Sequence, residues 1–431
     1  METIRHMNKI QTPSWQKLLV ELYGPHQLAV QTDRYQQLLA GYREHYGEGD
    51  ALSLFSSPGR TEIGGNHTDH NHGKVLAASI DLDTIAAAFP TEDSVISIVS
   101  EGYPDQYRID LSDLEPKPEE SGTLALIRGI AAGFVDKGFK IGGFNAYVSS
   151  NVLSASGLSS SASFEMLICT IMNTFYNEGS LDTVMMAKIG QYAENQFWNK
   201  PSGLLGQMAC AYGGLITIDF ENPEQPVIEP VKTQFRNKGY SLVIVSTGGN
   251  HADLTEDYAA VPGEMKAVAR ALDGEVVRDL TVEQIYSNLG TLRQQVGDRA
   301  VLRALHFLEE NERVEQEVAA LQTGRLEDFL QLVTASGNSS WKWLQNVYRE
   351  SEVKEQGIAI ALALTEIYLR RIGTGACRVH GGGFAGVILA ILPEEHAEDY
   401  TAYIKRALAT PVFNIQIREQ GAVCLNDMVN G

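Results

Sequence analysis

The spacing of apolar residues changes between helical and strand-like several times along the chain. Apolar residues at helical spacing predict helices over residues 13–46, 123–135, 164–176, 181–197, 301–321, 325–333 and 355–369. Short apolar runs predict strands over residues 52–55, 84–89, 95–99, 144–148, 215–220, 242–245 and 387–392. Because helices and strands mix without strict alternation, we predict an α+β fold.

The length of the chain and one change in composition predict two domains. A chain of 431 residues is longer than a single hydrophobic core usually serves. Residues 221–230 are rich in proline and acidic side chains, as expected of a surface connection. We therefore expect an N-terminal domain over residues 1–225 and a C-terminal domain over residues 226–431.

A serine-rich stretch, residues 156–165, lies between a predicted strand and a predicted helix. Gly157 and the serines after it fall where a loop enters the helix. Unpaired N–H groups and the positive end of the helix dipole attract anions there, and a hydroxyl group can contact a metal ion. The stretch is a candidate phosphate site. The alternative is a serine cap on a buried helix, since serine is favoured at that position.

Composition restricts the partners. The formal net charge of −20 argues against binding to nucleic acid or to an anionic membrane, although it leaves room for a small anionic ligand. The four cysteines are widely spaced and match no zinc or disulfide pattern, which favours a reducing compartment. The first ten residues lack an apolar signal region, and no run of about 18 apolar residues marks a membrane span. We expect a cytoplasmic protein.

Residues 61–74 are dense in polar side chains and include three histidines, His67, His70 and His72. Histidines so close together suggest a metal site, but a ligand set needs defined spacing and geometry, and no cysteine flanks them. We favour hydrogen-bonding roles for them.

Three separated stretches together resemble one family. Residues 58–76, which begin Pro-Gly-Arg-Thr-Glu-Ile-Gly-Gly-Asn-His-Thr-Asp-His-Asn, resemble the galactokinase signature. The serine loop resembles the phosphate-binding motif of the galactokinase, homoserine kinase, mevalonate kinase and phosphomevalonate kinase superfamily. Residues 378–386, Arg-Val-His-Gly-Gly-Gly-Phe-Ala-Gly, are similar to that superfamily's third motif. Weaker similarities at residues 193–195, 202–207 and 251–258 lie between them in the expected order.

The resemblance implies a two-domain sugar kinase that binds ATP, Mg²⁺ and a small sugar in the cleft between its domains. It implies that Ser161 and Glu194 ligate the metal ion. We expect a monomer. By the same resemblance, the phosphates of ATP are held by Ser154, Ser156, Gly157, Leu158, Ser159, Ser160, Ser161 and Ala162.

The resemblance also assigns residues to the reacting sugar. Arg60 matches the arginine beside the reacting hydroxyl, where a cation stabilises developing negative charge. The expected sugar contacts are Asn66, His67, Asp69, Gly203 and Tyr258. Each assignment has a structural alternative. Arg60 could anchor a carboxylate, Asp69 could cap a turn, Glu194 could be an exposed helix residue, and Tyr258 could belong to the core.

The sequence departs from the family pattern at functional positions. Gly206 stands where the family has its catalytic aspartate, and Asn66 stands where it has a glutamate. Residues 259–262 lack the paired arginines that follow the family's sugar-binding tyrosine.

Three interpretations follow from these departures. The protein is a kinase that phosphorylates a hydroxyl, the anomeric one, of galactose or a related sugar, with Glu62 or Asp69 as a substitute base. Its acceptor has changed to another hexose, an amino sugar or a sugar alcohol. Or it is a sensor that binds sugar and ATP without turnover. We prefer the kinase, because Arg60 and the phosphate loop have little use without transfer.

Overall fold

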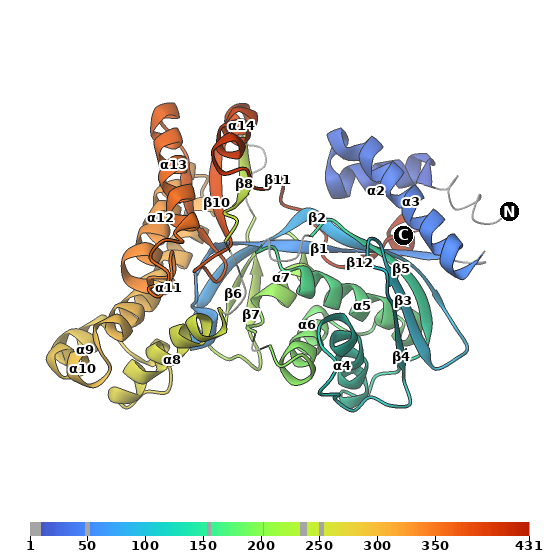
Figure 1. The fold of residues 1–431 in the computed structure, drawn as a ribbon, viewed down its shortest axis with the longest axis horizontal. Coiled ribbons are helices and arrows are strands. Elements are labelled where there is room, and N and C mark those ends of the chain that lie inside the picture. The colour runs from blue at the N-terminus through green and yellow to red at the C-terminus, as the bar shows by residue number, and fades with distance from the viewer. Residues whose placement is uncertain are drawn as a thin grey trace.

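The computed structural model describes residues 10–47, 52–152, 157–200, 202–232, 239–249 and 254–430. Over these residues the chain forms two β-sheets, each covered by helices, so the predicted α+β class is confirmed. Figure 1 shows the larger sheet on the right and the smaller one on the left, each with its own helices.

The larger sheet has the strand order β12-β1-β2-β5-β3-β4, with β6 paired to β2 and β7 paired to β6. Among the described pairs only β3 and β5 run parallel. The bounds of its strands are β1 (Ser53–Gly64), β2 (Lys74–Pro90), β3 (Val95–Ser100), β4 (Gln106–Asp110), β5 (Phe144–Ser150), β6 (Leu215–Asp219), β7 (Val227–Pro230) and β12 (Val423–Cys424).

Strand β2 shows why this sheet is covered on both faces. Successive side chains of a strand point to opposite faces. Ala86 and Ala88 therefore join one core cluster, while Ile85 and Ala87 join another. The first cluster lies under α4 to α7 and the second under α2 and α3, on opposite sides of the sheet (Figure 1). These helices are α2 (Pro13–Tyr23), α3 (Leu28–Tyr46), α4 (Gly122–Asp136), α5 (Ser160–Asn177), α6 (Thr183–Tyr192) and α7 (Leu205–Tyr212).

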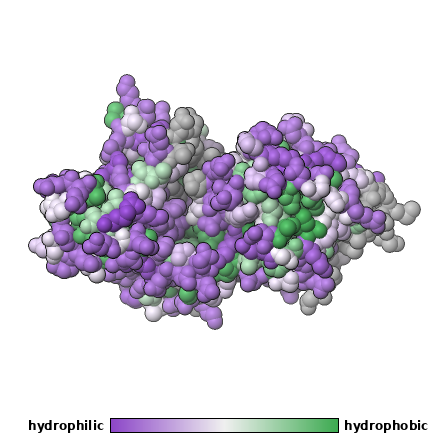
Figure 2. Space-filling model, turned by 90° about the horizontal axis from the view of Figure 1, so that it is seen from below, coloured by the Kyte–Doolittle hydropathy of each residue, from purple (hydrophilic) through white to green (hydrophobic). Residues whose placement is uncertain are grey.

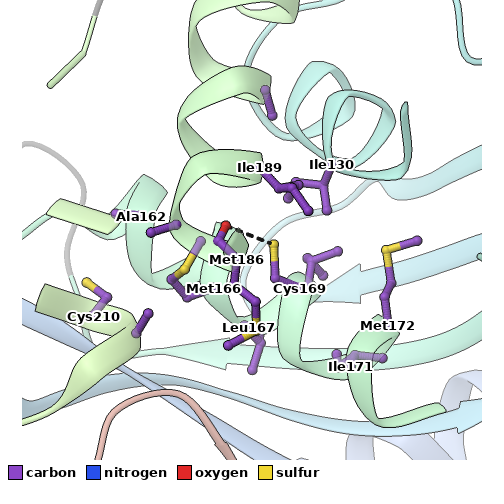
Figure 3. Packing of buried hydrophobic residues seen from close by; sticks show 14 of the residues in the cluster. Ile130, Ala162, Met166, Leu167, Cys169, Ile171, Met172, Met186, Ile189 and Cys210 are labelled. Carbon is purple, nitrogen blue, oxygen red and sulfur yellow. Dashed lines mark hydrogen bonds between the residues drawn. The ribbon is translucent and has the colours of Figure 1, made fainter. Parts of the chain in front are cut away.

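Helix α5 is the central helix of this layer and carries the serine loop at its N-terminus. Figure 3 shows its buried side chains Met166, Leu167 and Cys169 among residues of α4, α6 and α7. The Cys169 thiol lies 3.8 Å from the carbonyl oxygen of Met186. Burial on all sides fixes the helix axis, and thereby the direction in which its N-terminal N–H groups point.

The smaller sheet has the order β11-β8-β10-β9, and all of its pairs are antiparallel. Leu242 and Ile244 of β8 pack toward α11 and α12, whereas Val243 and Val245 pack toward α13 and α14. The bounds here are β8 (Tyr240–Ser246), β9 (Ala376–His380), β10 (Val387–Pro393), β11 (Val412–Ile415), α11 (Asp298–Gln322), α12 (Leu326–Ser339), α13 (Gly357–Ile372) and α14 (Ala397–Leu408).

The remaining elements are short, apart from one helix at the edge of the molecule. They are α8 (Thr255–Ala271), α9 (Val282–Ser287), α10 (Leu289–Gln295), α15 (Leu425–Asn430), the 3₁₀ turns η1 (Pro25–Gln27), η2 (Asp69–Asn71), η5 (Val277–Asp279) and η7 (Glu394–His396), and the π-helical turns η3 (Ala193–Phe197) and η6 (Ser340–Leu344).

The predicted elements are present, except that the helix predicted over residues 13–46 is divided at Gly24 into α2 and α3. Two further differences are informative. Strand β1 does not stop at Phe55 but continues to Gly64, so Arg60 and Glu62 of the first motif lie on a strand paired with β2, whereas its later polar residues lie in the turn after that strand. Helix α8, which the apolar pattern did not predict, contains Pro262 in its interior. Its polar face and this proline weaken the periodic signal.

The domain boundary at residues 225 and 226 stays a prediction. Strands β7 and β12, which follow it in the sequence, hydrogen-bond into the larger sheet. Strand β12, near the C-terminal end, thus pairs with β1, the first strand of the larger sheet.

The face seen in Figure 2 is mostly covered by polar residues, with a hydrophobic patch over the helical layer of the larger sheet. Among the described residues, no helix combines the length and the apolar character needed to cross a membrane.

Candidate active site

A cavity of about 780 Å³ lies where the two sheets and α8 meet, and most of the predicted site residues line it. Its walls come from β1 and the turn after it, the start of α5, the segment from η3 to α7, α8, and the glycine-rich turn after β9. The predicted residues among its lining are Arg60, Asn66, His67, Asp69, Ser159, Ser161, Ala162, Glu194, Gly203 and Tyr258.

Strand β1 positions Arg60 against the serine loop. Arg60 Nη1 donates a hydrogen bond of 2.7 Å to the carbonyl oxygen of Gly157, and its backbone N–H donates to Leu158 O at 3.1 Å. Glu62 lies two residues further along the strand, on the same face. Arg60 therefore stands between the loop and the cavity as a fixed cation.

The serine loop contains a glycine at a position that has no room for a side chain. Gly157 has φ +73°, and a side chain there would meet Val387 at 2.7 Å. Ser159 precedes α5 in a left-handed conformation (φ 59°), and Ser159, Ser161 and Ala162 face the cavity. The N-terminal turn of this 18-residue helix thus opens on the cavity, as an anion site requires.

The other predicted loop residues differ in placement. Leu158 turns its side chain into the core, where it is 1% exposed, and contributes only its backbone at this point. Ser160 does not line the cavity. Ser154 and Ser156 lie outside the described residues.

Ser161 and Glu194, the predicted metal ligands, lie side by side. Ser161 Oγ donates to Glu194 Oε1 at 2.6 Å, and Lys200 Nζ lies 2.6 Å from the same oxygen and 3.2 Å from Ser161 Oγ. Gln207 donates to the other carboxylate oxygen at 3.0 Å. Burial by itself raises the pKa of Glu194, but Lys200 and the hydroxyl bond outweigh it and lower the pKa below its ordinary value.

This donor set fits Mg²⁺. Magnesium is usually held by one or two carboxylates together with substrate phosphates and water, and it prefers hard oxygen ligands. The ionised Glu194 and the Ser161 hydroxyl supply such oxygens at the N-terminus of α5. The ammonium group of Lys200 contacts the same Glu194 oxygen in this structure, so Mg²⁺ would compete with it there.

Asn66 follows a sharp turn at Gly65 (φ +85°) and is completely buried. Its side-chain amide donates to Glu62 Oε1 at 2.8 Å and to Gly381 O at 2.7 Å. Its side-chain oxygen accepts from Asn346 at 2.9 Å and from Ser340 at 3.3 Å. Because four protein partners already surround this amide, the predicted contact of Asn66 with a sugar hydroxyl stays a prediction.

His67 also has a left-handed backbone (φ 59°), and its Nε2 donates to Gly382 O at 2.9 Å. Burial lowers the pKa of His67 to about 4, so the ring is neutral at pH 7. Its Nδ1 has no hydrogen-bond partner in the part of the chain that the structure describes. This nitrogen is therefore an acceptor for a ligand hydroxyl.

Gly203 makes room for Asp69. A side chain at position 203 would come within 2.0 Å of Asp69 Oδ2, so only glycine lets the carboxylate pack there. Asp69 Oδ1 accepts a hydrogen bond of 2.9 Å from the backbone N–H of His70. Asp69 and Gly203, both predicted to contact the sugar, thus pack directly against each other.

Gly206 lies in the first turn of α7 and lines the cavity. A Cβ atom at this position would lie 3.1 Å from Ser159 Oγ and 3.5 Å from Ala162 Cβ. A longer side chain at position 206 would therefore lie beside the serine loop. Gly206 itself supplies neither a base nor a side-chain hydrogen-bonding group at this position.

Tyr258 of α8 closes another wall of the cavity. Its ring packs edge-on against Phe384 at 5.8 Å, and its hydroxyl donates to Gly383 O at 3.4 Å. A side chain at Gly382 would meet the tyrosine ring at 2.4 Å. Burial raises the pKa of Tyr258 to about 12, so its hydroxyl stays protonated.

A buried polar network behind the cavity was missed by the sequence analysis. Arg378 donates to Glu62 Oε1 at 2.9 Å and to Ile63 O at 2.7 Å. Glu310 of α11 accepts the backbone N–H of Gly65 at 3.1 Å. His306 and Glu310 lie one helical turn apart on α11 and are both buried. Polar residues at this spacing on the buried face of a helix were the sequence signal for the network.

The fold is that of the GHMP kinases. The structure of a mevalonate kinase from Methanococcus jannaschii superposes with a TM-score of 0.61 over 86% of this chain and 99% of that chain, at 16% identity. The GHMP kinases N terminal domain matches residues 125–214, which include the serine loop and Glu194.

The comparisons also identify the family within this class. The galactokinase galactose-binding signature matches residues 40–90. A galactokinase from Clostridium tetani is 30% identical over 351 residues, covering 80% of this chain and 85% of that protein. One from Limosilactobacillus reuteri is 30% identical over 85% of this chain and 92% of its own. The structure of Lactococcus lactis galactokinase complexed with galactose gives a TM-score of 0.78 at 25% identity, over 91% of this chain and 100% of that chain. The chain belongs to the galactokinase family.

Proposed function

We propose that the protein transfers the γ-phosphoryl group of ATP to a hydroxyl group, the anomeric one, of galactose or a related sugar. The observation that carries the proposal is the meeting of three features in one cavity: Arg60, the N-terminus of α5, and the pair of Ser161 and Glu194. Phosphoryl transfer depends mainly on positioning and charge neutralisation, and these residues supply both.

In this proposal the residues have separate roles. The N–H groups at the start of α5 hold the phosphates, and Ser161 and Glu194 hold Mg²⁺. The metal ion, when bound, neutralises charge on the phosphates. Arg60, fixed by Gly157, stabilises the negative charge of the transferred group.

The sugar would occupy the part of the cavity that lies beyond Arg60. Asp69 and His67 line the cavity and offer acceptors to sugar hydroxyls, and Tyr258 forms one of its walls. Gly203 acts through the space that it leaves for Asp69. A direct contact of Asn66 with the sugar would require its side chain to exchange a protein partner, because that side chain is already hydrogen-bonded.

The test is ADP release from ATP and Mg²⁺ against a panel of hexoses, amino sugars and sugar alcohols. Arg60→Met removes the fixed cation and should lower kcat by about 10²- to 10³-fold. Arg108→Met, at an exposed arginine on β4, is the matched control and should keep full activity.

The result decides between the interpretations. Sugar-dependent ADP release that Arg60→Met abolishes supports the kinase and names its acceptor. Saturable sugar binding in a thermal-shift measurement without turnover would instead support a sensor, with Gly206 as the reason. Neither binding nor turnover across the panel would overturn both. A monomeric state and a cytoplasmic location stay predictions.

A further inference from the structure

Three carboxylates face the cavity among the residues that the structure describes, namely Glu62, Asp69 and Glu194. Removal of a proton from the acceptor hydroxyl needs a carboxylate oxygen that protein donors do not already occupy. Glu194 does not meet this condition, because Lys200 and Gln207 donate to its two oxygens at 2.6 and 3.0 Å.

Asp69 is also partly engaged. Its Oδ1 accepts the backbone N–H of His70 at 2.9 Å. Its Oδ2 packs onto Gly203, 2.0 Å from the place where a Cβ atom would lie. One oxygen is hydrogen-bonded and the other is partly covered, which suits a binding contact better than proton transfer.

Glu62 has one oxygen fixed and one free. Oε1 accepts from Asn66 Nδ2 at 2.8 Å and from Arg378 Nη2 at 2.9 Å. Oε2 has no hydrogen-bond partner among the described residues, although the side chain is only 9% exposed. Arg60 lies two residues away on the same strand face, about 7 Å along β1.

We propose that Glu62 is the general base of the phosphoryl transfer; this rests on the function proposed above. Glu62 Oε2 accepts the proton of the acceptor hydroxyl as the hydroxyl oxygen bonds to the γ-phosphorus of ATP. The bond between that phosphorus and the β–γ bridging oxygen breaks, and its electron pair leaves with ADP. The proton then passes from Glu62 to water. Arg378 and Asn66 are positioning residues that aim the free oxygen.

The surroundings of Glu62 suit this role. Burial raises the pKa of Glu62, and Arg378 and Arg60 oppose the rise without cancelling it. A raised pKa makes a carboxylate a better proton acceptor near neutral pH. The charged or titratable groups that surround it on β1, η2, α11 and β9 are Arg60, Asp69, Glu317, Arg378 and His380.

The first test is Glu62→Gln, which keeps the size of the side chain and an acceptor for Asn66. We expect kcat to fall by about 10²- to 10³-fold while the KM for the sugar changes by less than about threefold. Asp69→Asn should show the opposite split, with its main effect on KM. Glu315→Gln, at an exposed carboxylate, is the control that leaves both constants unchanged.

The pH profile supplies a second readout. In the wild type, kcat should fall as the pH drops through the pKa of Glu62, because the protonated carboxyl group cannot act as a base. Glu62→Gln should lose this limb, and Glu62→Asp should keep it with a lower plateau. Glu62→Asp therefore keeps the proposal testable if the glutamine variant does not fold.

Gly206→Asp in the Glu62→Gln background tests the role directly. The new Cβ atom would meet Ser159 Oγ at 3.1 Å, a contact that rotation of the serine relieves, and it would bring a carboxylate to the cavity. We expect at least about tenfold recovery of kcat. Full turnover in Glu62→Gln, or an unchanged acid limb, would overturn the proposal. Absence of turnover in the wild type would overturn the proposed function instead.

Discussion

Asp83 lies at the centre of a buried ionic network that joins the N-terminal helices to the larger sheet and to the C-terminal segment. Its carboxylate is fully buried and lies 2.5 Å from Arg34 Nη1 and 3.1 Å from Arg418 Nη1. The hydroxyl groups of Tyr23 and Ser56 also donate to it. We expect Asp83→Asn to destabilise the fold strongly without any contact to the cavity.

The magnitude follows from the charges left behind. Arg418 is completely buried and Arg34 nearly so, and the asparagine cannot neutralise either of them. Removing one partner of a buried ion pair typically costs about 3–5 kcal/mol, because the remaining charge stays in a medium that solvates it poorly. We expect a loss of unfolding free energy in this range at pH 7.

Urea unfolding followed by circular dichroism measures this loss. Asp33→Asn, at an exposed aspartate of α3, is the matched control and should change the unfolding free energy by less than about 0.5 kcal/mol. A cost for Asp83→Asn of less than about 1 kcal/mol would refute the reasoning, since a surface ion pair contributes that much.

The effect should depend on pH. Burial raises the pKa of Asp83, but Arg34, Arg418 and the hydroxyl donors outweigh it, so the folded pKa lies below the ordinary value of 3.8. A group with a depressed folded pKa stabilises the fold above its unfolded pKa and loses this contribution as the pH falls through the folded one. The difference between wild type and Asp83→Asn should therefore stay constant from pH 7 to pH 5 and narrow below about pH 4. A difference in unfolding free energy that stays constant down to pH 3 would contradict this account of the ionic network around Asp83.

Three further outcomes are expected from the surroundings of the cavity. Gly64→Ala should lower the unfolding free energy by about 1–3 kcal/mol in thermal or urea unfolding, because its Cβ atom would lie 1.9 Å from a buried oxygen of Glu317; an unchanged midpoint would contradict this packing. The His67 ring should show no protonation by NMR between pH 7 and pH 5, because its pKa is about 4. The unfolding free energy should fall as the pH drops below 6.5, because only the unfolded chain takes up the proton in that range. Lys200→Met should lower the Mg²⁺ concentration for half-maximal ADP release several-fold, because the ammonium group no longer competes for Glu194; a higher requirement would show that Lys200 assists the metal site.

Much of the fold could be predicted from local sequence patterns. The apolar runs at residues 242–245 and 387–392 became β8 and β10, the two central strands of the smaller sheet. The serine loop and the helix after it were predicted because small residues followed by a regular apolar repeat are a local signal. Short edge strands such as β9 and β11, and helix α8 with its internal proline, gave no comparable signal.

The candidate site likewise contains residues that the sequence predicted and residues that it did not. That Arg60 and Ser161 lie at the candidate site could be predicted from the sequence, because both belong to short motifs whose backbone geometry is local. Lys200 was not singled out, since its contact with Glu194 depends on how the π-helical turn η3 and the loop after it fold back.

The sequence by itself determined the family, the α+β class and the polar composition of the first motif. Only the tertiary structure decided what that motif does with its polar groups. It paired Glu62 with Arg378, 316 positions away in the chain, and enclosed Asn66 among protein partners. The physical reason is that periodicity and motifs report interactions between neighbours in sequence. The partner of a buried carboxylate, and the oxygen that it leaves free, depend on how distant segments pack.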